Sequence, residues 1–133
     1  QDMYQVTNEA FGSDHHPTEA ALSLDLRLCT GSEPRVCRVV AYDPVRDMPV
    51  CAGGINLFPE NDIAMLWAGG TLSEYRGRGA YSAVLAARIA WARKRGVRYV
   101  GLFAKKDSSA PIVIRRGFRD FGGVHYWERK KTS

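Results

Sequence analysis

The sequence predicts a mixed α/β fold, and three features of the chain predict it. Residues 35–42 are rich in valine and alternate between apolar and polar side chains, which is typical of a strand. Residues 63–68 form a short, continuous apolar run, which is typical of a buried strand. In residues 81–92, which lead to Gly96, apolar side chains instead recur every three or four residues, and this spacing predicts a long helix. Strands joined to a helix in this way indicate a sheet with helices packed on it.

Turn residues divide the rest of the chain into further elements. Thr18 is suited to cap a helix, because its hydroxyl accepts a hydrogen bond from a first-turn amide. The glycine pair Gly69-Gly70 suits a β-bulge at the end of the apolar strand. The expected order is a helix end over 3–11, a loop over 12–17, a helix from 18 to about 29, a turn over 31–34, a hairpin of strands 35–42 and 49–57 around residues 43–47, a turn over 59–62, the strand from 63, the long helix, and a strand over 98–103.

The most informative stretch is Arg76-Gly77-Arg78-Gly79-Ala80-Tyr81, which ends the apolar strand segment and opens the long helix. Glycines at a helix start allow backbone N–H groups to approach a ligand closely. Those groups have no partner within the helix, and the helix dipole adds about half a positive charge there. Two arginines in the same run strengthen an anion site. The run therefore predicts a binding loop for a phosphorylated ligand, with an ordinary tight turn as the alternative.

The spacing of the glycines excludes two common kinds of phosphate-binding loop. The chain has no Gly-x-x-x-x-Gly-Lys-Ser/Thr run, and the dinucleotide fingerprint would need a glycine where Ser82 stands. The run resembles the pyrophosphate loop of the GCN5-related N-acetyltransferases, whose pattern is Arg/Gln-x-x-Gly-x-Gly/Ala. Arg76, Gly79 and their spacing match this pattern, whereas Tyr81 stands where the family usually has glycine or alanine.

The resemblance covers about half of the chain, from Ile63 to Trp127. Residues 72–75 resemble the approach to the loop, residues 109–118 resemble the helix and Gly-Phe turn that follow, and residues 123–128 resemble the closing strand. It implies one domain over 1–133 with a strongly bent, mixed central sheet flanked by helices. The family's first strand is apparently missing. We therefore expect a trimmed chain, or the C-terminal part of a longer one, whose open edge strand is covered by a preceding segment or by a second copy in a homodimer.

The resemblance implies direct transfer of an acetyl group from acetyl-CoA to a primary amine of a small molecule or protein. It places the pantetheine arm along the strand that precedes the loop, like an added strand. Ser108 lies where the family has a polar residue near the adenosine or pantetheine. The residues expected to bind acetyl-CoA are Thr71, Leu72, Ser73, Arg76, Gly77, Arg78, Gly79, Ala80, Tyr81, Ser82 and Ser108.

The catalytic groups are less clear from the sequence. Many family members carry a tyrosine four residues before the glycine of the Gly-Phe turn, where it can protonate the departing thiolate. Val113 occupies that position here. Tyr126 and Tyr81 are alternative candidates for this acid by residue type alone. Because an amine is almost wholly protonated at neutral pH, a base is also needed, and Glu74 lies closest to the loop, ahead of Glu60 and Asp62. Val113 favours an alternative function, a non-catalytic acyl-CoA-binding or regulatory domain.

Charge is distributed unevenly along this chain of net charge +5. Residues 1–75 hold four basic and eleven acidic side chains, whereas residues 76–133 hold fifteen basic and three acidic ones. A basic half suits a cosubstrate with several phosphates, and an acidic half suits a cationic amine. The basic residues form no recognisable DNA- or RNA-binding module, so a nucleic-acid partner is not expected.

Cysteine usage and hydropathy point to a cytoplasmic protein. Cys29, Cys37 and Cys51 are an odd set without Cys-x-x-Cys spacing, so neither a disulfide framework nor a zinc site is predicted. Asp14, His15 and His16 lack a further ligand at useful spacing, and we expect no metal. No apolar run is long enough for a membrane span, and no membrane partner is expected.

Overall fold

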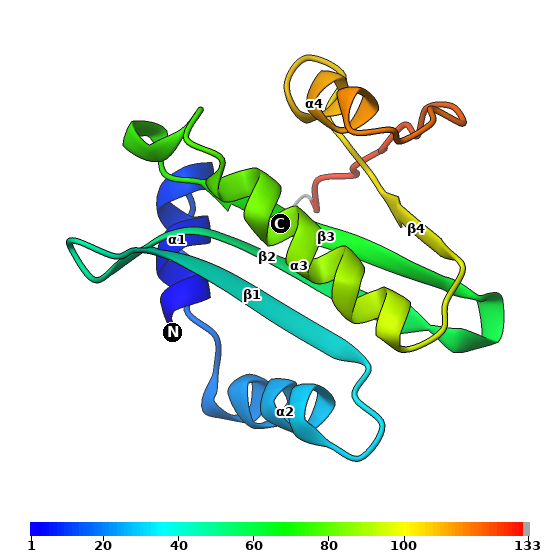
Figure 1. Ribbon diagram of the computed structural model, residues 1–133, viewed down its shortest axis with the longest axis horizontal. Helices are drawn as coiled ribbons and strands as arrows, with labels where there is room; N and C mark the ends of the chain where they lie inside the picture. Colours follow the sequence, from blue (N-terminus) through cyan, green and yellow to red (C-terminus); the bar gives the residue numbers. More distant parts are fainter. Residues whose placement is uncertain (132–133) are drawn as a thin grey trace. The chain divides into compact units, whose positions relative to one another are not determined.

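The structure is a computed structural model that describes residues 1–131 (Figure 1). It divides into two compact units, Gln1–Phe103 and Ala104–Ser133. The first unit contains α1 (Asp2–Phe11), α2 (Glu19–Thr30), β1 (Val36–Asp43), β2 (Met48–Phe58), β3 (Ile63–Thr71), α3 (Ala80–Lys94) and β4 (Tyr99–Leu102), with short 3-10 turns η1 (Pro59–Asn61) and η2 (Ser73–Tyr75).

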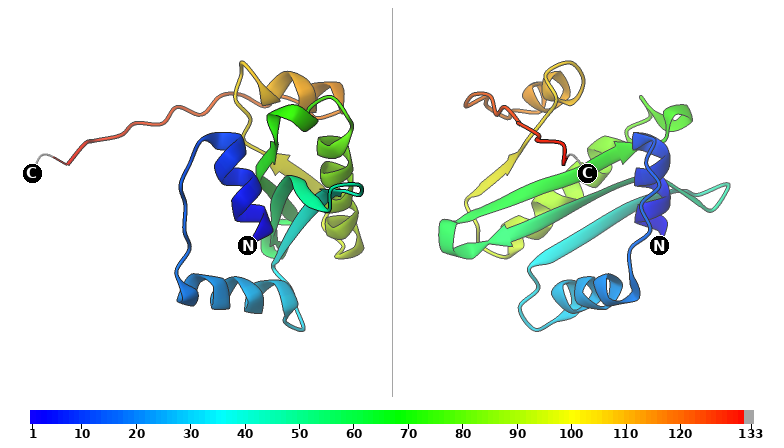
Figure 2. Two further views of the ribbon diagram at one scale, coloured as in Figure 1. Left: turned by 90° about the vertical axis from the view of Figure 1, so that its left-hand side faces the viewer. Right: turned by 180° about the vertical axis from the view of Figure 1, so that it is seen from behind.

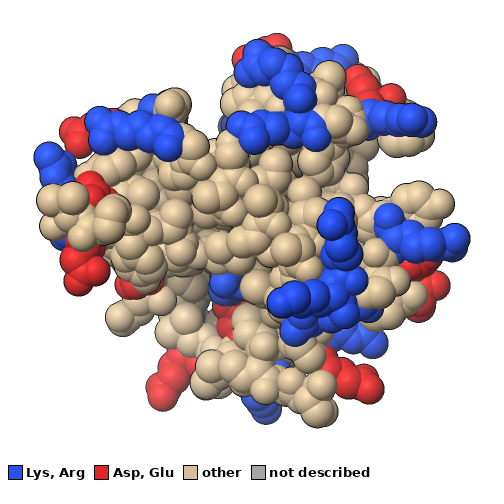
Figure 3. Space-filling view, in the orientation of Figure 1, with Lys and Arg blue, Asp and Glu red and all other residues tan. Residues whose placement is uncertain are grey.

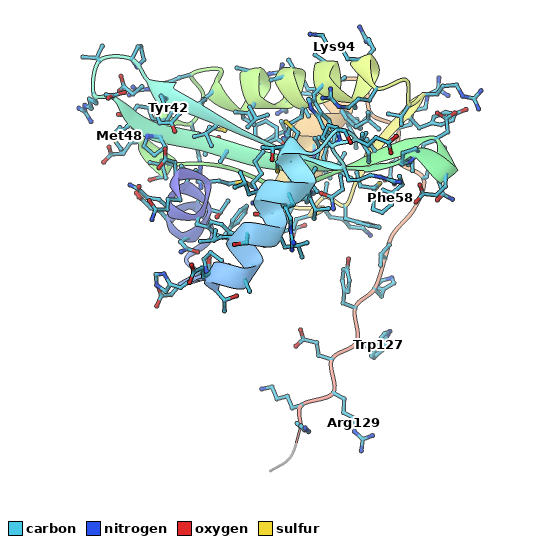
Figure 4. The ribbon with its side chains drawn as sticks, turned by 90° about the horizontal axis from the view of Figure 1, so that it is seen from below. Tyr42, Met48, Phe58, Lys94, Trp127 and Arg129 are labelled. Carbon is cyan, nitrogen blue, oxygen red and sulfur yellow. The ribbon has the colours of Figure 1, made fainter. Side chains whose placement is uncertain are left out.

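The first unit is built on a mixed sheet with strand order β1-β2-β3-β4. The β1–β2 and β2–β3 pairs are antiparallel, and the β3–β4 pair is parallel. Figures 2 and 4 show α3 on one face of this sheet and α1 and α2 on the other. Tyr42 and Met48 mark the hairpin end of the sheet in Figure 4, and Phe58 lies toward its opposite end. The predicted mixed α/β fold is confirmed.

One hydrophobic cluster of the core lies between the sheet and α1. Met3 and Val6 of α1 are buried against Val50 and Ala52 of β2, and Leu72 and Tyr75 complete this cluster. Each such side chain contributes roughly 1.5–3 kcal/mol by leaving water. The second helix differs, because none of its residues is buried. Its predicted start is confirmed, since the Thr18 hydroxyl accepts a hydrogen bond from the Ala21 amide at 3.2 Å.

A β-bulge interrupts β3 opposite the middle of β2. Ala52 pairs with Gly70 and Gly54 pairs with Trp67, so Ala68 and Gly69 together face Gly53. Ala68 has a φ of +51°, which is costly for a residue with a Cβ. The bulge was predicted at Gly69-Gly70 and lies one residue earlier. It also explains why the consecutive residues Trp67 and Ala68 both pack against the α1 core cluster.

The parallel pair of β3 and β4 is short. Ile63–Leu66 of β3 pairs with Tyr99–Leu102 of β4, while β3 itself continues to Thr71. The edge of β3 that faces β4 therefore changes at Leu66 from a paired ladder to an edge without a strand partner in the described part of the chain. Such an edge presents backbone N–H and C=O groups to any extended ligand.

The second unit contains α4 (Ser109–Arg115). Val113 of α4 is buried, and the Phe118 amide donates to the Val113 carbonyl at 3.2 Å, which closes the predicted Gly-Phe turn. The closing strand predicted over residues 123–128 is wrong, because this segment has no strand structure. No strand in residues 119–131 is available to pair with this alternating segment, and a single unpaired strand is not stable. Trp127, labelled in Figure 4, is 94% exposed.

The closest packing across the sheet predicts a large effect for Gly54→Ala. A Cβ at Gly54 would lie 2.3 Å from the Trp67 ring, which is fixed by a 2.7 Å hydrogen bond from its indole N–H to Asn56. We expect the free energy of unfolding in urea to fall by about 1–3 kcal/mol. Gly123→Ala is the control, since a Cβ there has no neighbour within 4 Å. Equal stability of the two variants would contradict this packing.

Candidate functional site

The loop between η2 and α3 has the geometry of an anion site. Gly77 and Gly79 have φ values of +74° and +85°, in the region that favours glycine. A Cβ at either position would find no heavy atom within 4 Å, so the space above the loop is open. Gly79 is the N-cap of α3, and the first intrahelical bond runs from the Ala83 amide to the Gly79 carbonyl at 3.0 Å. The backbone at Ala80 and Tyr81 precedes that bond and lies at the positive end of the helix dipole.

The two loop arginines are exposed, and the guanidinium group of each makes one contact with the protein. Arg76 donates from Nε to the Thr71 carbonyl at 3.3 Å. The Arg78 guanidinium lies 5.1 Å from the centroid of the Tyr75 ring, a cation–π contact. Both contacts leave several guanidinium N–H donors at the loop surface. The arginines thus add charged donors to the backbone site, as their spacing predicted.

Tyr75 anchors the loop to the β1–β2 hairpin. Its ring is buried in the α1 core cluster, and its hydroxyl donates to Asp43 at 2.8 Å. The Val45 amide also donates to Asp43, at 2.8 Å, and Arg46 donates to the Tyr75 hydroxyl at 3.4 Å. The hydrogen bond from Val45, followed by that from Tyr75, lowers the pKa of Asp43. The bond to Asp43 raises the pKa of Tyr75, which therefore stays a neutral donor.

The three residues predicted to line the pantetheine arm differ in their surroundings. Thr71 and Leu72 are buried, and Ser73 is exposed in η2. The Leu72 amide donates to the Val50 carbonyl at 2.9 Å, which directs it toward β2. Thr71 instead presents its carbonyl to Arg76, and its hydroxyl donates to Cys51 at 3.1 Å. Backbone groups directed away from β2 are thus found at Thr71 and on the unpaired edge of β3 beyond Leu66.

Arg88 is the residue of this region that the sequence analysis missed. Its side chain is 1% exposed, and it donates from Nη1 to the carbonyls of Gly54 and Trp67, at 3.0 and 3.4 Å. These carbonyls flank the bulge, where the ladder is interrupted. Burial lowers the pKa of its guanidinium, and the neighbouring Tyr81 partly opposes this shift. A basic residue on the sheet-facing stripe of α3, opposite the pair Gly53-Gly54, is the signal that could have identified it.

The sequence-predicted acid and base candidates are spread over the chain. Glu74 is exposed in η2, beside the loop. Glu60 forms an ion pair with Arg35 at 3.2 Å, and its own backbone amide and Arg35 lower its pKa. Asp62 forms an ion pair with Arg98, which lowers the pKa of Asp62 and links η1 to the segment before β4. Both ion pairs have a structural role, since they link turns to neighbouring segments. Of the three candidates, only Glu74 forms no such ion pair within the described residues.

The remaining predicted residues belong to different surroundings. Ala80 and Ser82 are half-buried in the first turn of α3, as Tyr81 is. Ser108 is the N-cap residue of α4, and Tyr126 is 78% exposed in the irregular segment after it. Both belong to the second unit, and their roles toward the loop stay predictions.

A search of the described residues for other kinds of site gives two plain results. In residues 1–131, no three His, Cys, Asp or Glu side chains gather as metal ligands would. No helix there has the length and hydropathy needed to cross a bilayer. Basic side chains collect at the C-terminal end of α3, where Arg93 and Lys94 occupy the last turn (Figure 3). This position suits the helix dipole and is distant in the chain from the glycine loop.

A glycine loop at a helix start, beside an unpaired strand edge, is an arrangement of an α/β protein that suits an extended phosphorylated ligand. Residues 1–118 match the model of the acetyltransferase (GNAT) family. The chain therefore belongs to this family and is an acetyltransferase of the acetyl-CoA-dependent class. The resemblance predicted from the loop motif is confirmed. A search of curated proteins gives no match.

Solved structures agree with this fold. An acetyltransferase of Trypanosoma brucei is 16% identical, with a TM-score of 0.74, over 96% of this chain and 91% of the other. An aminoglycoside acetyltransferase from an uncultured soil metagenomic sample is 13% identical, with a TM-score of 0.77, over 98% and 87%. AAC(6')-Iy, solved with a CoA bisubstrate analog, is 14% identical, with a TM-score of 0.69, over 96% and 88%.

The Asp43–Tyr75 contact predicts a dependence of stability on pH. Because the folded pKa of Asp43 is lowered, its stabilising contribution is complete above the unfolded value near 3.9 and is lost as the pH falls through the folded pKa. We expect urea unfolding to show a larger loss of stability below about pH 4 for the unmodified chain than for Asp43→Asn. Tyr75→Phe, which removes one donor to Asp43, should show an intermediate loss of unfolding free energy as the pH falls. Parallel curves for the unmodified chain and Asp43→Asn would refute the contact.

Proposed function

We propose that this protein transfers the acetyl group of acetyl-CoA to a primary amine of a small molecule or of a protein, by direct attack of the amine on the thioester. The observation that supports the proposal most strongly is the pairing of the open glycine loop at Gly77–Gly79 with the unpaired edge of β3. The loop and the strand edge are continuous in the chain. Together they match the two chemically different parts of the cosubstrate, a pyrophosphate and an amide-containing arm.

The residues present fit acetyl-CoA well. The left-handed glycines leave the loop surface clear, and the helix dipole with Arg76 and Arg78 supplies positive charge for the pyrophosphate. The arm contains amide groups that pair with backbone N–H and C=O groups as a strand does. The bound cosubstrate supplies the activated acyl group. The protein's part is then to hold the thioester beside an amine whose proton has been removed. Glu74, which lies beside the loop, is the proposed base and would act on the amine through a chain of water.

The acceptor side of the proposal rests on a cavity beside α1. This cavity of about 590 Å³ is lined by the outer face of α1 and by the loop that leads to α2, with Tyr4, Asn8, Glu9 and His15 among its residues. One carboxylate among hydroxyl, amide and imidazole groups suits a cationic, hydroxylated amine. Some relatives of similar fold are named as acetyltransferases of aminoglycosides. A small polyhydroxylated amine is therefore the first acceptor class to test.

An alternative function, a non-catalytic acyl-CoA-binding or regulatory domain, is favoured by one observation. Val113 is buried, and its side chain carries no proton to donate. Within the main proposal, the reaction takes place in the cytoplasm. Free thiols at Cys29, Cys37 and Cys51 support a reducing compartment. A homodimer or an N-terminal segment that covers β1, one of the two edge strands of the described sheet, also stays a prediction.

Loss of loop geometry should weaken the binding of acetyl-CoA. Gly79→Ala puts a side chain on a φ of +85°, whereas Gly96→Ala puts one on a φ of +81° just beyond α3, again with no neighbour within 4 Å. The backbone strain is thus matched, and only the first position lies in the loop. Isothermal titration should show an affinity loss of about tenfold or more for Gly79→Ala and of less than about twofold for Gly96→Ala. Equal losses would place the site elsewhere.

Turnover separates the proposed enzyme from the non-catalytic alternative. Acetyl-CoA and a panel of aminoglycosides, amino sugars and lysine peptides should release free CoA thiol, measured by a thiol-reactive dye. Glu74→Gln should lower kcat by about 10²-fold at pH 7, with a smaller loss at higher pH as the amine deprotonates unaided. Tight binding of acetyl-CoA without turnover of any amine would favour the non-catalytic domain.

A further inference from the structure

The unpaired edge of β3 has a defined inner end. Pairing between β3 and β4 stops at Leu66 and Leu102, so the space beside β3 closes there. In the proposed function, an arm that enters from the glycine loop runs back along β3 and ends beside Trp67–Gly69. This inner end contains the bulge, where Ala68 has a positive φ. The reacting thioester is therefore expected at the bulge, not at the loop.

One hydroxyl from α3 lies at this point. A Cβ built on Gly69 would be 3.0 Å from the Tyr81 ring and 3.5 Å from its hydroxyl oxygen, so the phenol lies directly over the bulge. Tyr81 is half-buried, in the first turn of α3 after the loop. Its side chain thus occupies the position between the loop and the inner end of the open edge. A glycine or alanine at position 81 would leave this position without a hydroxyl.

The orientation of Tyr81 is set by Arg88. The guanidinium is fixed by the carbonyls of Gly54, Trp67 and Val84, at 3.0, 3.4 and 3.3 Å, and its Nη2 and the phenol oxygen lie 3.3 and 3.5 Å from the same Cβ position on Gly69. Arginine has only donors, so toward this neighbour the phenol oxygen acts as the acceptor. The phenol hydrogen remains available for another acceptor. The buried guanidinium places positive charge behind the bulge, where it favours negative charge that develops in the reaction.

We propose that Tyr81 is the catalytic acid that protonates the departing thiolate, and that Arg88 is its positioning residue. The proposal rests on the proposed function. The amine nitrogen attacks the acetyl carbon to give a tetrahedral intermediate, and the C–S bond then breaks with its electron pair on sulfur. The sulfur takes the phenol proton and leaves as the thiol of CoA. The nitrogen loses one proton to the base, and the phenolate regains a proton from solvent, so that amide and thiol are the products.

Tyr81→Phe tests this role, because it keeps the ring over Gly69 and removes only the hydroxyl. We expect kcat to fall by about 10²-fold, while KM for acetyl-CoA changes by less than about twofold. Tyr99→Phe is the matched control, since Tyr99 is 59% exposed at the start of β4 and should leave kcat unchanged. Circular dichroism and thermal unfolding of both variants check that the fold is retained.

A binding measurement gives a readout that does not depend on turnover. CoA and desulfo-CoA differ only at the sulfur, so the ratio of their Kd values reports contacts to that atom. The unmodified chain should bind CoA about three- to tenfold more tightly than desulfo-CoA, and Tyr81→Phe should bind both equally. An unchanged ratio and an unchanged kcat in Tyr81→Phe would overturn the role of Tyr81 and leave the proposed function intact. Failure of the unmodified chain to bind acetyl-CoA would instead overturn the proposed function itself.

The role of Arg88 is tested by the same substitution in the unmodified chain and in the Tyr81→Phe variant. Arg88→Lys keeps the charge but has fewer donors to hold Gly54, Trp67 and Tyr81 together. If Arg88 acts through Tyr81, this change lowers kcat about tenfold in the unmodified chain and has almost no effect on kcat in Tyr81→Phe. Equal losses in the two backgrounds would mean that Arg88 supports the fold alone and would remove it from the proposal.

Discussion

The bulge in β3, filled by the guanidinium of Arg88, is the constraint on which the arrangement of the site depends. Two residues of β3 face one of β2 here, and the carbonyls of Gly54 and Trp67 are bound by a side chain from the opposite layer. Glycines at 53 and 54 make this possible, since a Cβ at either would collide with Arg88 or Trp67. A buried cation that loses these partners would be costly. The sheet, α3 and the open strand edge are therefore held in one arrangement.

The pyrophosphate loop depends on the same arrangement at its other end. Tyr75 is fixed both by the α1 core cluster and by Asp43, and Arg78 lies over its ring. The loop that follows needs positive φ at two glycines and thus has a defined path. Affinity for an anion then comes from amides and arginines that are already in place, so little ordering is needed on binding. In the proposed function, binding and chemistry are joined along β3, with the loop at one end and the bulge at the other.

Local patterns predicted most of the fold, because they reflect backbone rules that hold in any context. The Thr18 cap, the hairpin around residues 43–47, the loop glycines and the Gly-Phe turn all follow from such rules. Residues 123–128 failed, because an alternating pattern does not say whether a partner strand is present. Arg88 was missed because a lone arginine in an apolar stripe is usually solvated, and only the register of β2 against β3 reveals its carbonyl partners. Glu74 and Tyr126 were chosen by residue type, which does not specify geometry.

The central claim is that one continuous segment, from the bulge in β3 to the first turn of α3, binds acetyl-CoA. Amide NMR of the ¹⁵N-labelled protein during titration with acetyl-CoA tests it most directly. The account predicts the largest shifts at residues 67–71 and 77–81, with small shifts at residues 19–30 of α2. Shifts centred on α2 or on the basic end of α3, with residues 67–71 unchanged, would contradict it.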